Sequence, residues 1–291
     1  MYVIFGASGH VGRATATRLA QAGHPVRAVV RKRERVADLA ALGCEIAVAD
    51  LNDSGSIRQA MEGALAVQVL CPVTPAEREP KQVMMRFIDL MALALEADPP
   101  ARVLALSDYG AERAQGTGLT LLFHYLEQRF KTIPTSLILL RSAEHMQNYL
   151  GSAKAALTSG VLQSLHHPVS KRFPIVAAQD VGYAAADLLT SAAPPTSVPL
   201  VVNIEGAQRL CTAEIALCLS QLGGRAIIAN PLPREHWAGA LQNAGLSPAY
   251  AELVADLYDA HNAGRIEVED LHDERRLGST TLTEVLRPLC L

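Results

Sequence analysis

The chain has 291 residues, of which 49% are hydrophobic, so it can bury a large core in one domain or in two unequal lobes. Its formal net charge of −3 argues against direct nucleic-acid binding, which relies on clustered Lys and Arg. No apolar run approaches the roughly 20 residues that cross a bilayer, and the five scattered cysteines lack metal-like spacing. We therefore expect a cytoplasmic protein with reduced thiols and no membrane segment, metal site or signal peptide.

The N-terminus predicts a dinucleotide-binding loop. A short apolar strand, residues 2–5, runs directly into Gly6-x-x-Gly9-x-x-Gly12. An amphipathic helical stretch and a second strand at residues 26–30 follow. In such a unit the glycines allow a tight turn and let a pyrophosphate approach the helix N-terminus. The alternative is a glycine turn that only joins two core elements.

A basic run after the second strand bears on which dinucleotide binds. Arg31-Lys32-Arg33 stands where an NAD site places an acidic residue that binds the ribose 2′-hydroxyl. A carboxylate there would repel the 2′-phosphate of NADP, whereas a guanidinium can bind it with paired hydrogen bonds. The sequence therefore favours NADP(H), and a solvated basic turn is the alternative.

Strand and helix patterns then alternate along the chain. Further strands are expected at residues 45–49, 64–71, 102–107, 136–140 and 201–202, and helices at residues 81–97, 118–130 and 177–190. This alternation predicts an α/β fold with a Rossmann-type, doubly wound parallel sheet. Ligands of such sheets bind at the carboxyl ends of the strands. The residues expected at that edge are Gly6, Asp50, Pro72, Ser107 and Ser142.

The last hundred residues have a different pattern. Residues 191–199, rich in Pro, Ser, Thr and Ala, suit a linker or a crossover loop. Helices are expected at residues 212–222, 234–243 and 248–262, the first with Thr212 as its N-cap. We expect residues 1–190 to form the NAD(P)-binding domain. Residues 191–291 would form a smaller, mainly helical C-terminal lobe on the substrate side, intertwined with the first domain.

Several motifs occur in a characteristic order. They are the opening Val3-Ile4-Phe5-Gly6-Ala7-Ser8-Gly9, then Ser107-Asp108-Tyr109-Gly110-Ala111, His124-x-x-Glu127, Leu140-Arg141-x-x-x-x-Met146-x-Asn148 and Gln179-Asp180-Val181-Gly182. In this order the chain resembles, over nearly its full length, the NmrA-like family of atypical short-chain dehydrogenases/reductases. Within that family it is most similar to the branch of NAD(P)H quinone and azo reductases.

The resemblance implies a set of cofactor contacts. The pyrophosphate would lie on the glycine-rich loop, formed by Gly6, Ser8, Gly9, His10, Val11 and Gly12. Arg31, helped by Arg33, would bind the 2′-phosphate, and Asp50 and Leu51 would border the adenine. Cys71 and Pro72 would contact the nicotinamide-side ribose, and Ser107 and Tyr109 would lie beside the nicotinamide. Two alternatives stay open: Cys71 as a small buried thiol, and Asp50 as a strand-end cap.

Ordinary short-chain dehydrogenases use Tyr-x-x-x-Lys, in which the lysine lowers the tyrosine pKa. This chain lacks that motif, since Tyr109 and Tyr125 are each followed four residues later by arginine. Alcohol–ketone interconversion is therefore not favoured. Reduction of a quinone or azo compound is less demanding, and Tyr109 and His124 are the candidate proton donors. His124 as a core residue of its helix is the alternative.

Two functions are consistent with these motifs. The favoured one is an NADPH-dependent oxidoreductase that passes a hydride to a small quinone- or azo-type acceptor. The alternative is a non-catalytic NADP(H) redox sensor of the NmrA type, which acts through a protein partner. The sequence identifies neither the acceptor nor the oligomeric state.

Overall fold

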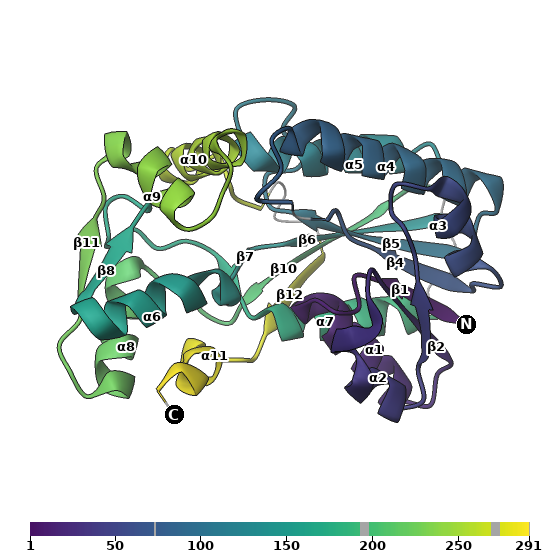
Figure 1. Ribbon diagram of the computed structural model, residues 1–291, viewed down its shortest axis with the longest axis horizontal. Helices are drawn as coiled ribbons and strands as arrows, with labels where there is room; N and C mark the ends of the chain where they lie inside the picture. Colours follow the sequence, from purple (N-terminus) through teal and green to yellow (C-terminus); the bar gives the residue numbers. More distant parts are fainter. Residues whose placement is uncertain (73, 193–197, 269–273, 291) are drawn as a thin grey trace.

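A parallel sheet forms the centre of the molecule (Figure 1). The computed structural model describes residues 1–72, 74–192, 198–268 and 274–290. Within these ranges, eight strands pair in the order β12-β10-β6-β5-β4-β1-β2-β3, all parallel. Their bounds are β1 Tyr2–Phe5, β2 Val26–Val30, β3 Glu45–Val48, β4 Ala66–Val69, β5 Arg102–Asp108, β6 Ser136–Ser142, β10 Leu200–Gly206 and β12 Glu274–Gly278. The expected doubly wound α/β fold is confirmed.

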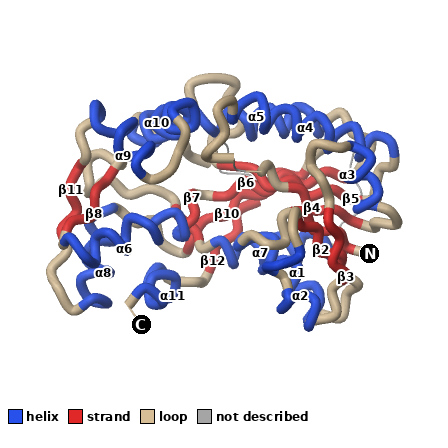
Figure 2. Tube along the Cα trace, viewed as in Figure 1, coloured by secondary structure: helices blue, strands red, loops and turns tan. Residues whose placement is uncertain are grey.

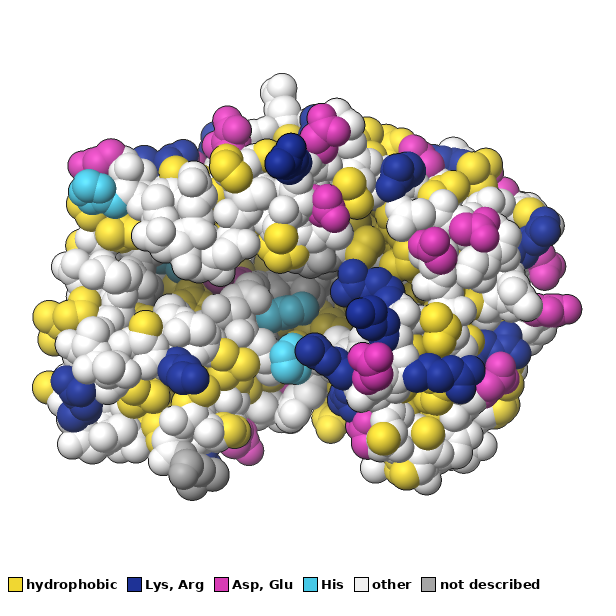
Figure 3. Space-filling view, viewed as in Figure 1, with side chains coloured by type: hydrophobic (Ala, Val, Ile, Leu, Met, Phe, Trp, Pro, Cys, Tyr) yellow, Lys and Arg dark blue, Asp and Glu magenta, His cyan; other side chains and the backbone are white. Residues whose placement is uncertain are grey.

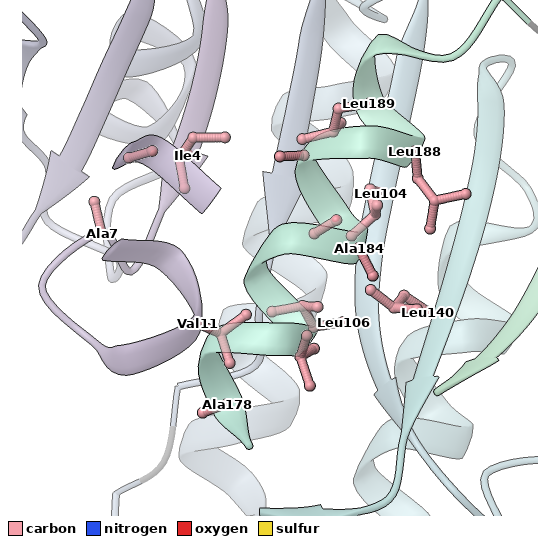
Figure 4. Close-up of a cluster of buried hydrophobic side chains, with 14 of the residues drawn as sticks. Ile4, Ala7, Val11, Leu104, Leu106, Leu140, Ala178, Ala184, Leu188 and Leu189 are labelled. Atoms are coloured by element: carbon pink, nitrogen blue, oxygen red, sulfur yellow. The ribbon is translucent and has the colours of Figure 1, made fainter. Parts of the chain in front are cut away.

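Helices cover both faces of this sheet. One face carries α1 (His10–Gln21), α2 (Ala37–Ala41) and α7 (Ala178–Thr190), and the other carries α3 (Ser54–Met61), α4 (Pro80–Ala97) and α5 (Leu121–Phe130). Because both faces are covered, the central strands are apolar almost throughout. Figure 4 shows the core beneath α7, where Leu188 and Ala184 lie against Leu104 and Leu140 of the sheet.

Helices α1 and α7 approach each other closely because of one glycine. A Cβ on Gly182 would lie 2.5 Å from the Ala14 Cβ and 2.6 Å from the Val11 carbonyl oxygen. The preceding Asp180 accepts hydrogen bonds from the Thr280 amide and hydroxyl, each at 2.8 Å. The Gln179-Asp180-Val181-Gly182 motif therefore fixes the start of α1, which follows the glycine-rich loop, and also the chain after β12.

A smaller part extends beyond the carboxyl ends of the strands (Figure 2). It contains β8 (Val161–Ser164) paired with β11 (Ile228–Pro231), together with α6 (Leu150–Ser159), α8 (Thr212–Gly223), α9 (Trp237–Asn243), α10 (Pro248–Asn262) and α11 (Leu282–Leu286). Helices α6, α8 and α11 bury a core of their own. Residues 150–164 thus belong to this part, whereas β10 and β12 belong to the main sheet.

Several local expectations need correction. The helix expected at residues 118–130 is a short 3-10 turn, η2 (Gly118–Thr120), followed by α5. The N-cap of α8 is Cys211 instead of Thr212, and its amide donates to the Glu214 carboxylate at 3.0 Å. Of the expected linker, residues 193–197 lie outside the described residues. The remaining short elements are β7 (Glu144–His145), β9 (Ile175–Val176), and the 3-10 turns η1 (Arg33–Arg35), η3 (Met146–Tyr149), η4 (Arg234–His236) and η5 (Arg287–Leu289).

Candidate functional site

The glycine-rich loop joins β1 to α1, and its glycines have different roles. Gly6 has a φ of +68°, which favours glycine, and a Cβ on Gly12 would lie 2.5 Å from the Gly6 carbonyl oxygen. Gly12 is therefore required by the packing of the loop on its own helix. Gly9 is the exposed N-cap of α1 and has no side chain to cap the helix amides. The N-terminus of α1 thus leaves its first amides open to an anion.

A basic pocket lies beside this loop. It has a volume of about 450 Å³ and is lined by Ser8, Arg31, Lys32, Glu34 and Arg35. Figure 3 shows basic side chains gathered next to the hollow across the middle of the molecule. The predicted helper Arg33 is an exposed residue of η1. The pocket brings the helix N-terminus and the predicted 2′-phosphate ligand Arg31 to one place.

Four predicted contacts lie at the ends of β3 and β4. The Asp50 carboxylate accepts hydrogen bonds from the Asn52 amide at 2.9 Å and from its side chain at 3.1 Å, so Asp50 serves as a turn cap. Leu51 packs partly into the core. Cys71 is 4% exposed, and burial raises the pKa of its thiol to about 12. Pro72, the next residue, is partly buried.

Ser107 is buried beneath the rim. Its hydroxyl donates to Glu127 Oε1 at 2.6 Å, and the same carboxylate pairs with Arg141. The hydroxyl thus faces α5 and is already engaged by a carboxylate. A contact between Ser107 and the nicotinamide stays a prediction.

The two predicted proton donors are placed differently. Tyr109 is 1% exposed, its hydroxyl has no hydrogen-bond partner among the described residues, and burial raises its pKa to about 12. His124 is partly buried, and its Nδ1 lies 2.8 Å from the Ala111 carbonyl oxygen, so this nitrogen carries the proton when the ring is neutral. Neither donor role is tested by this arrangement, and both stay predictions.

Tyr125 and Arg129 do not form a substitute for the Tyr/Lys pair. The Tyr125 hydroxyl donates to Asp89 at 2.7 Å, and Arg129 pairs with Glu96 at 2.6 Å, both on the neighbouring α4. These contacts join α4 to α5 at the surface. Arg129 is thus a partly buried arginine that pairs with carboxylates of α4.

Further polar groups lie at the ends of β5 and β6: Ser142, which was expected at this edge, and Asp108 and His145, to which the sequence assigned no role. Asp108 accepts a hydrogen bond from the Thr120 hydroxyl at 2.7 Å. His145 Nε2 lies 3.1 Å from the Ser142 hydroxyl, and burial lowers the pKa of His145 to about 4 although Glu144 opposes this. His145 is therefore neutral near pH 7. Asp108 lies within the Ser107–Ala111 motif, and Ser142 and His145 lie within the Leu140–Asn148 motif. Their presence in these motifs was the sequence signal that could have identified Asp108 and His145 as site residues.

A buried polar cluster connects β7 to α10. The Glu144 carboxylate accepts hydrogen bonds from Tyr258 at 2.8 Å and from His166 at 2.9 Å. Burial alone would raise the pKa of Glu144, but His166, His261 and the Tyr258 hydroxyl together lower it. The cluster holds α10, which belongs to the smaller part, against the end of the main sheet.

The described ranges contain no grouping of three or more His, Cys, Asp and Glu side chains suited to a metal ion. Among the described helices, none combines the length and the hydropathy needed to cross a membrane.

Sequence comparison identifies the first half of the chain. Residues 6–143 match the sequence profile of a family described as NAD(P)H-binding. This part of the chain is an NAD(P)H-binding domain. The match begins at Gly6 and ends at Ala143, just beyond β6, so it spans the glycine-rich loop, the basic pocket and the ends of β4, β5 and β6.

Full-length relatives support the fold. The chain is 22% identical over 268 residues to an NAD(P)H azoreductase of Xenophilus azovorans, a match that covers 89% of this chain and 86% of the relative. It is 23% identical over 260 residues to quinone oxidoreductase 2 of Escherichia coli (strain K12), covering 88% and 86%. A crystal structure of the Escherichia coli NADPH-dependent quinone oxidoreductase with NADPH matches with a TM-score of 0.81 at 21% identity, covering 99% of both chains. The fold implied by the resemblance to atypical short-chain dehydrogenases is confirmed.

The residues present fit an NAD(P)H molecule. Gly9 is exposed, and the Gly6 carbonyl oxygen, at 3.3 Å, is the one atom beyond its chain neighbours within 4 Å of a Cβ placed there, so the region in front of the α1 amides is otherwise unfilled by the described residues. Beyond the loop, Arg31, Lys32 and Arg35 line the pocket and outnumber its carboxylate, Glu34. A pyrophosphate and a second phosphate would both find donors in this region.

Proposed function

We propose that this protein is an NADPH-dependent oxidoreductase that reduces a small quinone- or azo-type acceptor. The observation that carries the proposal is the joint placement of the open α1 N-terminus and the Ser8–Arg31 pocket at the carboxyl edge of the sheet. The names of the azoreductase and quinone oxidoreductase relatives support the choice of acceptor class.

NADPH would bind along this edge of the sheet. Gly6, Ser8, Gly9, His10, Val11 and Gly12 would hold the pyrophosphate, and Arg31 with Arg33, Lys32 or Arg35 would bind the 2′-phosphate. Asp50 and Leu51 would lie beside the adenine, and Cys71, Pro72 and Ser107 beside the nicotinamide half. NADPH supplies a hydride when it is bound. The protein would orient the acceptor, exclude water and provide the proton.

The acceptor would bind between the sheet and the smaller part of the chain. In functional terms, we propose that residues 1–190 hold the cofactor and that residues 191–291, with α10 and its Glu144 contacts, bound the acceptor. A cytoplasmic location, where NADPH is available, is part of this proposal.

The deciding experiment follows NADPH oxidation with a panel of small quinones and azo dyes, beside binding titrations of NADP(H) and NAD(H). We expect turnover of at least one acceptor class and tight binding of NADPH. Tight NADPH binding with a flat trace for every acceptor would overturn the proposal. It would favour the redox sensor, whose partner protein would then be sought with the oxidised and reduced cofactor forms.

A further inference from the structure

Asp108 occupies a distinctive place at the carboxyl edge of the sheet. It is the last residue of β5, is paired in register with Ser142 at the end of β6, and remains partly exposed. The residues on either side of Asp108 are buried: the Ser107 hydroxyl is hydrogen-bonded to Glu127, and Tyr109 is 1% exposed. Of these three residues, Asp108 is the one whose side chain remains partly exposed at the carboxyl edge.

A hydrogen bond from Thr120 holds the Asp108 carboxyl in position. The fully buried Thr120 in η2 donates its hydroxyl proton to Asp108 Oδ2 at 2.7 Å. The turn η2 itself is pressed onto α10, because a Cβ on Gly118 would lie 2.3 Å from the Leu253 carbonyl oxygen and 2.4 Å from the Leu257 amide nitrogen. Asp108 is therefore fixed in position by the helix that bounds the acceptor side.

The surroundings of Asp108 favour its protonated form. Burial is the main cause that raises its pKa to about 7; the carboxylates of Glu144 and Glu112 act in the same direction, and the Thr120 hydroxyl and the Tyr109 amide oppose the rise. Asp108 in turn acts on Tyr250 of α10, as does Cys71 after β4, and burial raises the pKa of both the tyrosine and the cysteine. Near neutral pH, a large fraction of the molecules thus carries a proton on Asp108 that can be donated.

We propose that Asp108 is the catalytic proton donor to the acceptor, held in place by Thr120 as a positioning residue. This inference rests on the proposed reductase function. A quinone that gains a hydride equivalent also needs one proton to become a hydroquinone. The O–H bond of the Asp108 carboxyl breaks and leaves its electron pair on the carboxylate, and a new O–H bond forms on the acceptor oxygen. The carboxylate then takes a proton from water at the exposed edge.

The first test compares Asp108→Asn with Asp98→Asn, an exposed aspartate at the opposite edge of the sheet, after α4. With a quinone that the unmodified enzyme reduces, Asp108→Asn should lower kcat by about tenfold or more, since a positioned donor contributes about 10²–10⁴-fold and water replaces part of it. The dissociation constant of NADPH should stay within about twofold. Unchanged kcat in Asp108→Asn would overturn the inference and leave the reductase function intact.

The second test needs no turnover. Infrared spectra of the protein without cofactor should contain a protonated-carboxyl absorption that disappears with a midpoint near pH 7, in both the unmodified chain and Asp98→Asn, and that is absent from Asp108→Asn. Thr120→Val removes a hydrogen bond to the charged form, so it should move this midpoint, and the alkaline limb of kcat/KM, upward by about one pH unit. A midpoint that belongs to another carboxyl, or a pH profile that Thr120→Val does not move, would contradict the assignment.

Discussion

Arg141 and Glu127 form a buried ion pair with two hydrogen bonds, from Nε to Oε1 and from Nη2 to Oε2, each 2.8 Å long. Their side chains are 4% and 0% exposed, and the pair joins β6 to α5. Ser107 of β5 donates to the same carboxylate, so three elements meet at one buried charge. The pair lies directly beneath the edge where Asp108 and Ser142 end their strands, and it therefore supports the candidate site from below.

Glu127→Gln should lower the free energy of unfolding by roughly 1.5–3 kcal/mol, because it removes two charge-assisted hydrogen bonds to the buried Arg141 guanidinium. Glu112, whose carboxylate lies 3.4 Å from Arg141 Nη1, remains as a countercharge. Urea unfolding of the variant measures this loss. The matched control is Glu96→Gln, which removes the partner of Arg129 on the surface of α4 and α5 and should cost at most about 1 kcal/mol. Equal losses in the two variants would show that the burial of the pair has no energetic consequence.

Arg31→Ala should remove most of the preference for NADPH over NADH. We expect the unmodified protein to bind NADPH at least about tenfold more tightly, which corresponds to about 1.4 kcal/mol and is within reach of one bidentate phosphate contact. Calorimetric titrations with both cofactors measure the ratio. Arg58→Ala, on the exposed side of α3, serves as the control and should keep the preference. Equal affinities in the unmodified protein would refute the NADP(H) assignment.

Gly9→Val and Gly12→Val should fail for different reasons. At Gly9, an exposed residue with an extended backbone, the valine would project in front of the α1 amides and meet one atom, the Gly6 carbonyl oxygen, 3.3 Å from its Cβ. The variant should therefore still fold and should lose NADPH binding. The Gly12 side chain would meet the Gly6 carbonyl oxygen at 2.5 Å, so that variant should also lose thermal stability. Thermal melts and NADPH titrations of both variants separate the two effects. Normal NADPH binding by Gly9→Val would mean that the loop is only a structural turn.

Tyr109→Phe distinguishes the two donor assignments. Its hydroxyl is buried without a partner among the described residues, so its removal should leave the free energy of unfolding unchanged or slightly higher. If Asp108 donates the proton, quinone turnover should change by less than about twofold, whereas a Tyr109 donor predicts a loss of about tenfold. His124→Ala, assayed in parallel, tests the remaining candidate. A turnover loss confined to Tyr109→Phe would favour Tyr109 over Asp108 as the donor.

Asp108→Asn should also change the pH dependence of stability. The folded protein keeps the Asp108 proton up to a pH of about 7, whereas the unfolded chain releases it near its ordinary pKa of 3.8. The unmodified protein therefore loses stability as the pH rises from about 4 to about 7, and the uncharged asparagine does not. The stability difference in favour of Asp108→Asn should grow by roughly 1–2 kcal/mol over this window, once partial exposure is taken into account. Unfolding curves at several pH values measure it, and a flat difference would place the Asp108 pKa at its ordinary value.

The sequence by itself determined the cofactor-binding half of the protein. The turn at Gly6, the amphipathic α1 and the apolar strands β1, β4 and β5 are encoded by residues close to one another in the chain, and their patterns can be recognised locally. Arg31 directly follows β2, so its place beside Ser8 in the pocket could be predicted from the local sequence pattern alone. By contrast, β12 has the sequence Glu-Arg-Arg-Leu-Gly, and an edge strand of this polarity has no apolar signal.

Only the tertiary structure decided the burial and the hydrogen-bond partners of the side chains at the carboxyl edge. Successive residues of a strand point to opposite faces, so the choice between Ser107, Asp108 and Tyr109 depended on what packs against each face. Helix α5 brought Glu127 to Ser107, the turn η2 brought Thr120 to Asp108, and the core beneath α7 enclosed Tyr109. These partners lie far from β5 in the chain or on another element, and burial and charge at a site are set by such non-local contacts. The sequence therefore predicted the edge of the sheet, and the fold determined which of its side chains are buried, hydrogen-bonded or partly exposed there.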